Sequence, residues 1–217
     1  MAHIFDLGPQ PVVPIEGMGE FPVRRIFCVG RNYAAHAAEM GNEVDREAPF
    51  YFTKSAHSIV LSGGDVAYPG RTQDLHHEVE LVVALGQDAQ VIAYGCGIDM
   101  TRRDLQAQAK EKRRPWDVGK DFDQSAVLAP MKPAEALGSI EDKRIVLSVN
   151  DELRQEGVVS DMIWSVQELV SDLGTLYALE PGDLIMTGTP AGVGALQRGD
   201  RVTAQIDDLP PLDIRII

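Results

Sequence analysis

Apolar residues recur along the chain in short runs rich in β-branched and aromatic side chains, and polar positions with glycine, aspartate or proline turn signals separate many of these runs. This pattern predicts a chain that is mostly β. Strands are predicted over residues 24–30, 57–61, 77–85, 90–98, 144–150, 183–187, 201–206 and 212–217.

Three stretches predict helices instead. An alanine-rich stretch directly follows the first strand, with Asn32 placed to cap it and Gly41 to end it. Thr101 and Asp104 have the spacing of a helix-capping pattern, and a later stretch has apolar residues at helical spacing. The predicted helices cover residues 32–40, 101–112 and about 161–177. Because strands and helices do not alternate strictly, we expect an α+β fold with a mixed or antiparallel sheet.

Length and composition fit one globular domain. The chain has 217 residues, of which 44% are hydrophobic and 24% are charged, and no linker rich in proline, serine and glycine divides its middle. We expect a single catalytic domain over residues 24–217. Residues 1–23 contain several prolines and carry no functional signal, so we expect them to form a loosely structured N-terminal arm.

Charge and hydropathy exclude several partners. The 20 basic and 33 acidic residues give a net charge of −13, which repels nucleic acid and anionic membranes. The longest apolar runs are about five residues, far below the roughly 20 of a membrane helix, and the chain does not open with a secretory signal pattern. We therefore expect a cytoplasmic protein. Cys28 and Cys96 stand singly in apolar segments, as is typical of buried free thiols.

Two glutamates could form part of a metal site. Side chains alternate along a strand, so Glu78 and Glu80 share one face, and the apolar residues between and after them share the other. Carboxylates about 7 Å apart at Cα can converge on one divalent cation such as magnesium or manganese. Taken alone, however, the pattern favours a solvent-exposed strand face, where alternate glutamates are common.

A third carboxylate lies at the end of the next strand. A turn after residue 85 predicts a hairpin, which would bring Asp99 alongside the glutamates as a metal ligand. Asp99 also precedes a predicted helix, so it could equally be a helix-start residue. His76 and His77 are adjacent and would diverge on a strand, which argues against zinc.

Three further residues could act in catalysis. His36 and Glu39 are three residues apart on a predicted helix, so the carboxylate could orient the imidazole for general-base chemistry, although such pairs are commonly surface residues. Lys120 could stabilise an oxyanion or enolate, although exposed lysines are more common. The glycine-rich residues 187–194 lack the lysine of a phosphate-binding loop and predict only a tight turn.

Together these pieces resemble the fumarylacetoacetate hydrolase family, over nearly all of the chain from about Arg25 onward. Six segments in order are more specific than any one of them. The matching segments are residues 29–33 with His36 and Glu39, then 49–54, 77–81, 97–106, 119–120 and 182–190.

The resemblance implies a mixed β-roll or sandwich of the family's C-terminal-domain type with a few short helices, usually as a homodimer. It implies that Mg²⁺ or Mn²⁺ binds to carboxylates that match Glu78, Glu80 and Asp99. It further implies that His36 and Glu39 lie on a mobile lid and activate water, and that Lys120 stabilises an enolate. Substrate contacts are expected from Arg31, Tyr33, Gln106 and Thr189.

The implied activity is hydrolysis of the carbon–carbon bond of a 2,4-dioxo acid, as in bacterial fumarylpyruvate hydrolases of aromatic-acid breakdown, to pyruvate and an acid such as fumarate. Oxaloacetate decarboxylation is a near alternative, and hydration or isomerisation of 2-oxo dienoic acids is another. A non-catalytic binding protein is the least favoured. Ser55 and Asp121 depart from the family pattern, which has proline and a small residue there, and either could change substrate preference.

Overall fold

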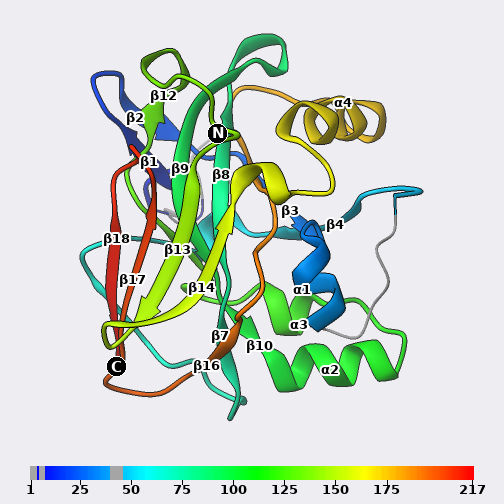
Figure 1. Ribbon diagram of the computed structural model, residues 1–217, viewed down its shortest axis with the longest axis vertical. Helices are drawn as coiled ribbons and strands as arrows, with labels where there is room; N and C mark the ends of the chain where they lie inside the picture. The colour runs from blue at the N-terminus through cyan, green and yellow to red at the C-terminus, as the bar shows by residue number, and fades with distance from the viewer. Residues whose placement is uncertain (1–3, 5–7, 40–45) are drawn as a thin grey trace.

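The computed structural model describes residue 4, residues 8–39 and residues 46–217, and most regular structure in these residues is β (Figure 1). The largest sheet curls into a half-barrel with the strand order β4-β3-β15-β8-β9-β11-β5, and β12 pairs with β9. It is mixed, because β3 runs parallel to β15 and β5 runs parallel to β11. Its strands are β3 (Arg25–Gly30), β4 (Phe50–Lys54), β5 (Ile59–Leu61), β8 (Val79–Leu85), β9 (Val91–Asp99), β11 (Ala126–Leu128), β12 (Lys132–Pro133) and β15 (Asp183–Met186).

A second sheet, with the order β14-β13-β17-β18-β6, packs against one face of the first. Leu81 and Leu85 of the larger sheet share a buried core with Leu147 and Ile206 of the smaller one. The strands are β6 (Asp65–Val66), β13 (Arg144–Val149), β14 (Glu152–Val158), β17 (Arg201–Ile206) and β18 (Leu212–Ile216). This layered, mostly β architecture confirms the predicted fold class.

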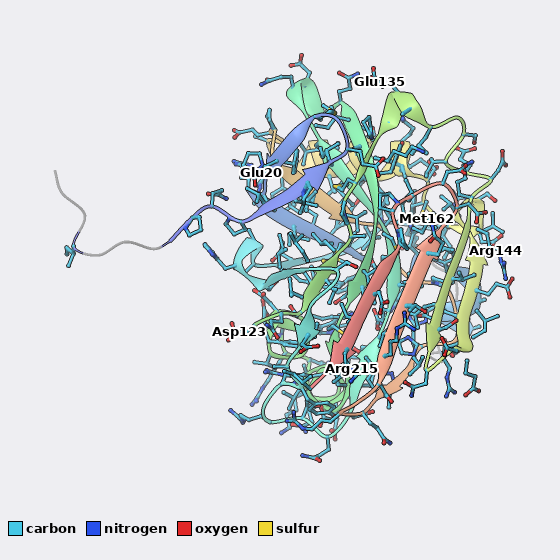
Figure 2. The ribbon with its side chains drawn as sticks, turned by 90° about the vertical axis from the view of Figure 1, so that its left-hand side faces the viewer. Glu20, Asp123, Glu135, Arg144, Met162 and Arg215 are labelled. Atoms are coloured by element: carbon cyan, nitrogen blue, oxygen red, sulfur yellow. The ribbon has the colours of Figure 1, made fainter. Side chains whose placement is uncertain are left out.

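The other face of the larger sheet is covered by a hairpin of β1 (Val12–Ile15) and β2 (Gly19–Pro22). Figure 2 shows this hairpin, which carries Glu20, on the opposite side of the molecule from Arg144. Val13 and Phe21 are buried in a second core, which they share with Val82 and Ala84 of β8. The expected loose structure of the N-terminal arm is therefore wrong for residues 12–22. Prolines are tolerated there because both strands of this two-stranded sheet are edge strands.

Helices and a small sheet occupy the margins of the two layers (Figure 1). None of the helices in the described part of the chain is long and apolar enough to cross a membrane. The α-helices are α1 (Ala34–Glu39), α2 (Arg103–Glu111), α3 (Asp117–Lys120) and α4 (Val166–Leu176), the 3-10 helices are η1 (Ala56–Ser58), η2 (Gln87–Ala89), η3 (Ala134–Ala136) and η4 (Val159–Asp161), and the small sheet has the order β10 (Thr101–Arg102), β7 (Leu75–His77) and β16 (Gly194–Leu196).

The predicted helix boundaries need three corrections. Asn32 does not cap α1, because its side chain instead hydrogen-bonds the main chain of Trp164 and Thr187. Thr101 is not a cap either, since it lies in β10 and α2 begins only at Arg103. Helix α4 begins after Ser165 rather than near residue 161, because Ser165 and Glu168 form its capping box. The predicted stop at Gly41 lies outside the described residues.

The predicted strand 77–85 is interrupted at Glu78. Strand β7 pairs with β10 and β16 of the small sheet, whereas β8 pairs with β9 and β15 of the larger sheet. Glu78 lies in the break between them, where the chain passes from one sheet to the other. This position brings the small sheet, α2 and the larger sheet together around one carboxylate.

Candidate active site

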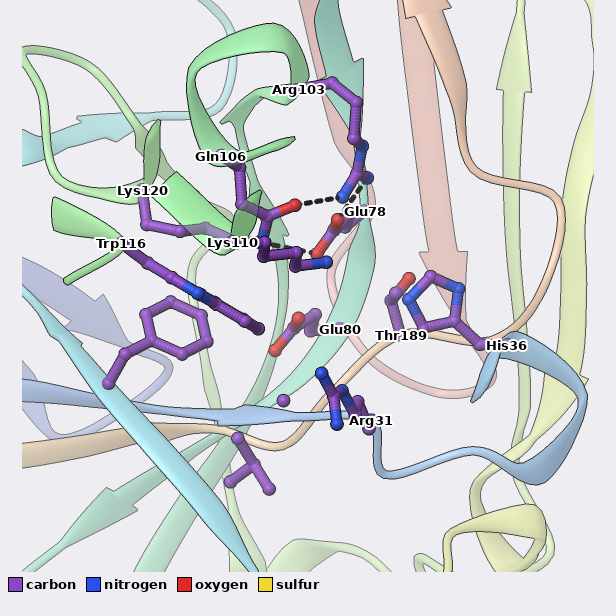
Figure 3. A pocket seen from close by; sticks show the side chains of 13 residues that line it. Arg31, His36, Glu78, Glu80, Arg103, Gln106, Lys110, Trp116, Lys120 and Thr189 are labelled. Atoms are coloured by element: carbon purple, nitrogen blue, oxygen red, sulfur yellow. Dashed lines mark hydrogen bonds and ion pairs between the residues drawn. The ribbon is translucent and has the colours of Figure 1, made fainter. Parts of the chain in front are cut away.

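A pocket lies where α1, α2 and α3 meet the ends of β3 and β8 (Figure 3). Ionisable side chains from five segments face it, including both of the predicted glutamates. The lining residues are Val29, Gly30, Arg31, His36, Phe52, Glu78, Glu80, Arg103, Gln106, Lys110, Trp116, Lys120 and Thr189.

Three carboxylates come together beside this pocket. Glu78 precedes β8, Glu80 lies within it, and Asp99 ends β9. The hairpin pairing sets Asp99 beside Glu78, whose carbonyl oxygen accepts the Asp99 N–H at 2.9 Å. One oxygen from each carboxylate lies within 4.8 Å of the others, and all three residues are buried. The solvent-exposed alternative for the glutamates is therefore wrong, and Asp99 does not start a helix.

Three cations neutralise part of this cluster. Lys120 Nζ donates to Glu78 Oε2 at 2.8 Å and to Asp99 Oδ2 at 2.6 Å. Lys54 Nζ lies 2.7 Å from Asp99 Oδ1, and the Arg103 guanidinium pairs with Glu78 Oε1. Although burial acts to raise it, Lys120 and Arg103 hold the pKa of Glu78 well below its usual range. Glu78 therefore stays ionised even though it is buried.

Glu80 lacks such a partner. It forms no ion pair with any residue that the structure describes, and its Oε2 accepts the Gly188 N–H at 2.8 Å. Burial and the neighbouring carboxylates of Asp99 and Glu78 raise the pKa of Glu80 well above its usual range. A cation among the three carboxylates would relieve this repulsion, and magnesium and manganese prefer such hard oxygen donors. The residues present thus fit a divalent cation.

A histidine and a glutamate form a pair on α1. His36 is buried, and its Nδ1 lies 3.3 Å from Glu39 Oε2. The Gly192 N–H also donates to Glu39, at 3.2 Å. Gly192 has φ +94°, and a side chain there would collide with the carbonyl oxygen of Arg154, so the position requires glycine. Burial lowers the pKa of His36, which favours the neutral imidazole with Nε2 as the proton acceptor.

The loop between β15 and β16 joins these groups, although its sequence predicted only a tight turn. Its Gly188 N–H bonds Glu80, and its Thr189 hydroxyl accepts a hydrogen bond from Gln155 Nε2 at 2.7 Å. Gln155 is fully buried on β14, and its Oε1 accepts a hydrogen bond from His77 Nδ1 at 2.9 Å. The loop therefore connects Glu80 on β8, Glu39 on α1 and Gln155 on β14.

Lys120 uses all of its donors within the protein. Besides the two carboxylates, its Nζ donates to Thr101 Oγ1 at 2.7 Å, which accounts for the three N–H groups of an ammonium. Although burial acts to lower it, Asp99 and Glu78 raise the pKa of Lys120 above its usual range. The structure thus places Lys120 as a counter-ion of the cluster. Contact with an enolate would require it to exchange one of these bonds, and that role stays a prediction.

Three of the four predicted substrate contacts line the pocket: Arg31, Gln106 and Thr189. Arg31 has φ +61°, a left-handed conformation that is uncommon for residues other than glycine and is concentrated at functional sites. Tyr33 does not line the pocket. Its hydroxyl is buried without a hydrogen-bond partner among the described residues. Burial and, to a smaller extent, the nearby Glu80 raise the pKa of Tyr33.

The two departures from the family pattern touch each other. The Ser55 N–H donates to Asp121 Oδ1 at 2.9 Å, and the Ser55 hydroxyl accepts the His57 N–H that begins η1. Asp121 is therefore turned toward this loop rather than toward the Lys120 ammonium. A proline at position 55 would have no N–H to donate, so the two departures are physically linked.

The neighbouring histidines diverge as predicted. His76 Nε2 lies 2.9 Å from Asp74 Oδ1, whereas His77 faces Gln155 on the other side of the strand. Cys28 and Cys96 are buried free thiols, which confirms that interpretation.

Sequence reasoning missed five residues of this site. Arg103 and Lys110 could have been found, because they are spaced three before and four after Gln106 and so share a helix face with it. Gln155 gave no signal, since a polar residue on a strand is ordinarily exposed. The five residues are Lys54, Arg103, Lys110, Trp116 and Gln155.

Comparison with known proteins agrees with this geometry. Residues 25–217 match the model of the fumarylacetoacetate (FAA) hydrolase C-terminal family. A fumarylpyruvate hydrolase of a Ralstonia species is 42% identical over 82% of this chain and 98% of its own length. The crystal structure of fumarylpyruvate hydrolase from Pseudomonas aeruginosa in complex with Mn²⁺ and pyruvate is 44% identical, superimposes with a TM-score of 0.95, and covers 100% of this chain and 99% of its own.

Relatives with another named activity also match. The mitochondrial oxaloacetate tautomerase FAHD1 of Arabidopsis thaliana is 40% identical over 85% of this chain and 87% of its own length. The family match, the full-length identity and the shared fold lead to one conclusion. This chain belongs to the fumarylacetoacetate hydrolase family.

Proposed function

We propose that this chain is a metal-dependent hydrolase that cleaves the carbon–carbon bond of a 2,4-dioxo acid, fumarylpyruvate or a related acylpyruvate, to pyruvate and an acid such as fumarate. The observation that carries the proposal is that one pocket holds both the buried carboxylate cluster and the His36–Glu39 pair. The two relatives named fumarylpyruvate hydrolase support the same substrate class.

Glu78, Glu80 and Asp99 would hold the cation, Mg²⁺ or Mn²⁺. When bound, such a cation supplies Lewis acidity to the carboxylate and 2-oxo oxygens of a 2,4-dioxo acid. Lys54 pairs with Asp99, and Lys120 pairs with both Asp99 and Glu78, so these two carboxylates are fixed in position. Arg31, Gln106 and Thr189 would contact the substrate from the pocket wall, whereas Tyr33 does not line the pocket.

His36 would act as the general base. Glu39 accepts the Nδ1–H and so orients the ring, which leaves Nε2 to take a proton from water. The water oxygen attacks the C4 carbonyl, the bond between C3 and C4 breaks, and its electron pair leaves on pyruvate as the enolate. The positive charge of Lys120 stabilises the enolate, and the proton held by His36 returns to C3.

Oxaloacetate is the second candidate substrate, and the relative named oxaloacetate tautomerase supports it. Decarboxylation of oxaloacetate ends in the same pyruvate enolate, and neither that reaction nor tautomerisation needs an attacking water. The His36–Glu39 pair therefore favours hydrolysis over decarboxylation, whereas tautomerisation moves a proton between C3 and oxygen and could use the same general base. The same pair argues against hydration or isomerisation of 2-oxo dienoic acids.

The test is pyruvate release from fumarylpyruvate with Mg²⁺ or Mn²⁺, with a chelator, and beside an oxaloacetate assay. His36→Ala should lower kcat by about 10²–10⁴-fold, because general-base catalysis is lost, while metal affinity stays near wild type. The exposed His57 provides the matched control, His57→Ala. Carbon dioxide release from oxaloacetate without His36, together with no cleavage of fumarylpyruvate, would move the chain to the decarboxylase function.

The remaining proposals concern the setting of the enzyme. A cytoplasmic role in aromatic-acid breakdown follows from the resemblance to bacterial fumarylpyruvate hydrolases, and a mitochondrial relative also exists.

A homodimer is also proposed from the resemblance to the family. The exposed aromatic side chains of Phe50 and Tyr177, which line one groove, support it. Sedimentation velocity would distinguish the dimer from a 23.7 kDa monomer.

A further inference from the structure

Lys110 faces the pocket from α2. Arg103, Gln106 and Lys110 are spaced three and four residues apart, which places them on one side of the helix. All three line the pocket, as does Arg31, and Figure 3 shows the Lys110 side chain among the other side chains that face it. Its Nζ lies 4.7 Å from the centroid of the Trp116 ring, which supports the cation from one side.

The charges of the pocket leave Lys110 without a carboxylate. Lys54, Lys120 and Arg103 pair with Glu78 and Asp99. Among the residues that the structure describes, neither Lys110 nor Arg31 forms an ion pair with an acidic group. Within the described part of the chain, no acidic group matches these two positive charges, in a pocket that would also receive a divalent cation.

The surroundings of Lys110 disfavour a positive charge. Burial, together with the cations Arg103, Arg31 and Lys120, lowers the pKa of Lys110 to about 8, against the opposing effect of Glu78. Keeping the Lys110 ammonium charged in these surroundings costs free energy. An anionic group on the ligand would return that cost on binding.

A 2,4-dioxo acid carries one carboxylate at its 2-oxo end, next to the proposed cation site. We propose that Lys110, which packs over the Trp116 ring, binds a second carboxylate at the far end of the acyl group. The substrate class is then a dianionic acylpyruvate rather than one with an uncharged acyl chain. This inference rests on the proposed function and specifies which substrate the pocket selects.

The test compares two substrates that differ in the second carboxylate, fumarylpyruvate and acetylpyruvate. Lys110→Met keeps the length of the side chain and removes its charge. It should lower the ratio of kcat/KM for fumarylpyruvate to that for acetylpyruvate by about 10–100-fold, as expected for one hydrogen bond between charged groups. Lys110→Arg should restore most of the ratio. Lys112→Met, on an exposed position at the end of the same helix, is the matched control and should leave the ratio unchanged.

A binding measurement separates this inference from the proposed function. Fumarate and crotonate share a trans four-carbon chain, but crotonate has a methyl group in place of the second carboxylate. With Mg²⁺ present, ligand-observed NMR should show that wild type prefers fumarate, and that Lys110→Met loses this preference while Lys112→Met keeps it. If wild type cleaves neither acylpyruvate, the proposed function fails, and the binding comparison still decides the role of Lys110. An unchanged substrate ratio or a retained fumarate preference in Lys110→Met would overturn the inference.

Discussion

Two groups of buried charge in this molecule differ in whether their charges are matched. At the start of β15, both oxygens of the buried Asp183 carboxylate are bonded, by the guanidinium groups of Arg24 and Arg25 and by the Glu180 N–H, at 2.7 to 3.1 Å. In the pocket, Glu80 has no cationic partner among the described residues.

This difference distinguishes charged groups that stabilise the fold, such as Asp183, from charged groups that would bind a ligand, such as Glu80. The Asp183 carboxylate has all of its partners within the protein and fixes β15 beside β3, so we expect this cluster to contribute to stability. Among the described residues, the Glu80 carboxyl group has no cationic partner, and the Arg31 and Lys110 side chains have no acidic one. A divalent cation and an anionic substrate would balance both. Variants in the two groups should therefore fail in different ways.

The largest effect is expected from Glu80→Gln. Activity should fall by about 100-fold or more, because one of three cation ligands is removed. The metal-free variant should be as stable as wild type or more stable, because the amide removes a buried, crowded carboxylate and still accepts the Gly188 N–H. Activity assays and thermal unfolding with a chelator check both parts. Strong destabilisation of the metal-free variant would show that Glu80 belongs with the structural charges.

Asp183→Asn should have the opposite signature. We expect the free energy of unfolding to fall by about 1–3 kcal/mol, because two guanidinium groups lose their carboxylate but, being 39% and 31% exposed, can be hydrated. The kcat of the folded variant should match that of wild type. Urea unfolding and an assay below the unfolding transition measure the two quantities. A large loss of kcat in the folded variant would contradict the assignment of Asp183 as a purely structural charge.

The smallest effect is the pH dependence of the difference in unfolding free energy between wild type and Asp183→Asn. Although burial acts to raise it, hydrogen bonds from Arg25, Glu180 and Arg24 lower the pKa of Asp183. A lowered folded-state pKa stabilises the protein above the ordinary aspartate pKa of about 3.9, and this stabilisation is lost as the pH falls toward the folded-state value. The gap between wild type and Asp183→Asn should thus be full at pH 7 and shrink below about pH 4. A gap that stays constant down to pH 3 would contradict the ion-pair explanation.

Much of the fold could be predicted from local pattern, because most strands and the placement of Glu78, Glu80 and Asp99 follow from alternation and a hairpin turn. What alternation could not reveal is that both faces of β8 are covered. The second cover is the hairpin of residues 12–22, whose prolines suggested a loose arm. The hairpin covers Val82 and Ala84, whereas Glu78 and Glu80 are enclosed by side chains of α2 and α3, which strand alternation could not reveal either.

The site was predictable where its residues are close in sequence and was missed where they are distant. His36 and Glu39 are one helical turn apart, whereas Gln155 meets Thr189 and His77 only through tertiary packing. Helix capping was also mispredicted, since Asn32 bonds a segment more than 130 residues away in the sequence. Polar side chains with several possible partners cannot be assigned from local spacing alone.

The most direct test of the central claim is a calorimetric titration of Mn²⁺ into metal-free wild type, Glu80→Gln and Asp183→Asn. The unmatched pocket predicts one ion per chain for wild type and Asp183→Asn with equal affinity. It also predicts that Glu80→Gln weakens binding by at least about 10–100-fold. Equal Mn²⁺ affinity in Glu80→Gln and wild type would contradict the assignment of the carboxylate cluster as a metal site.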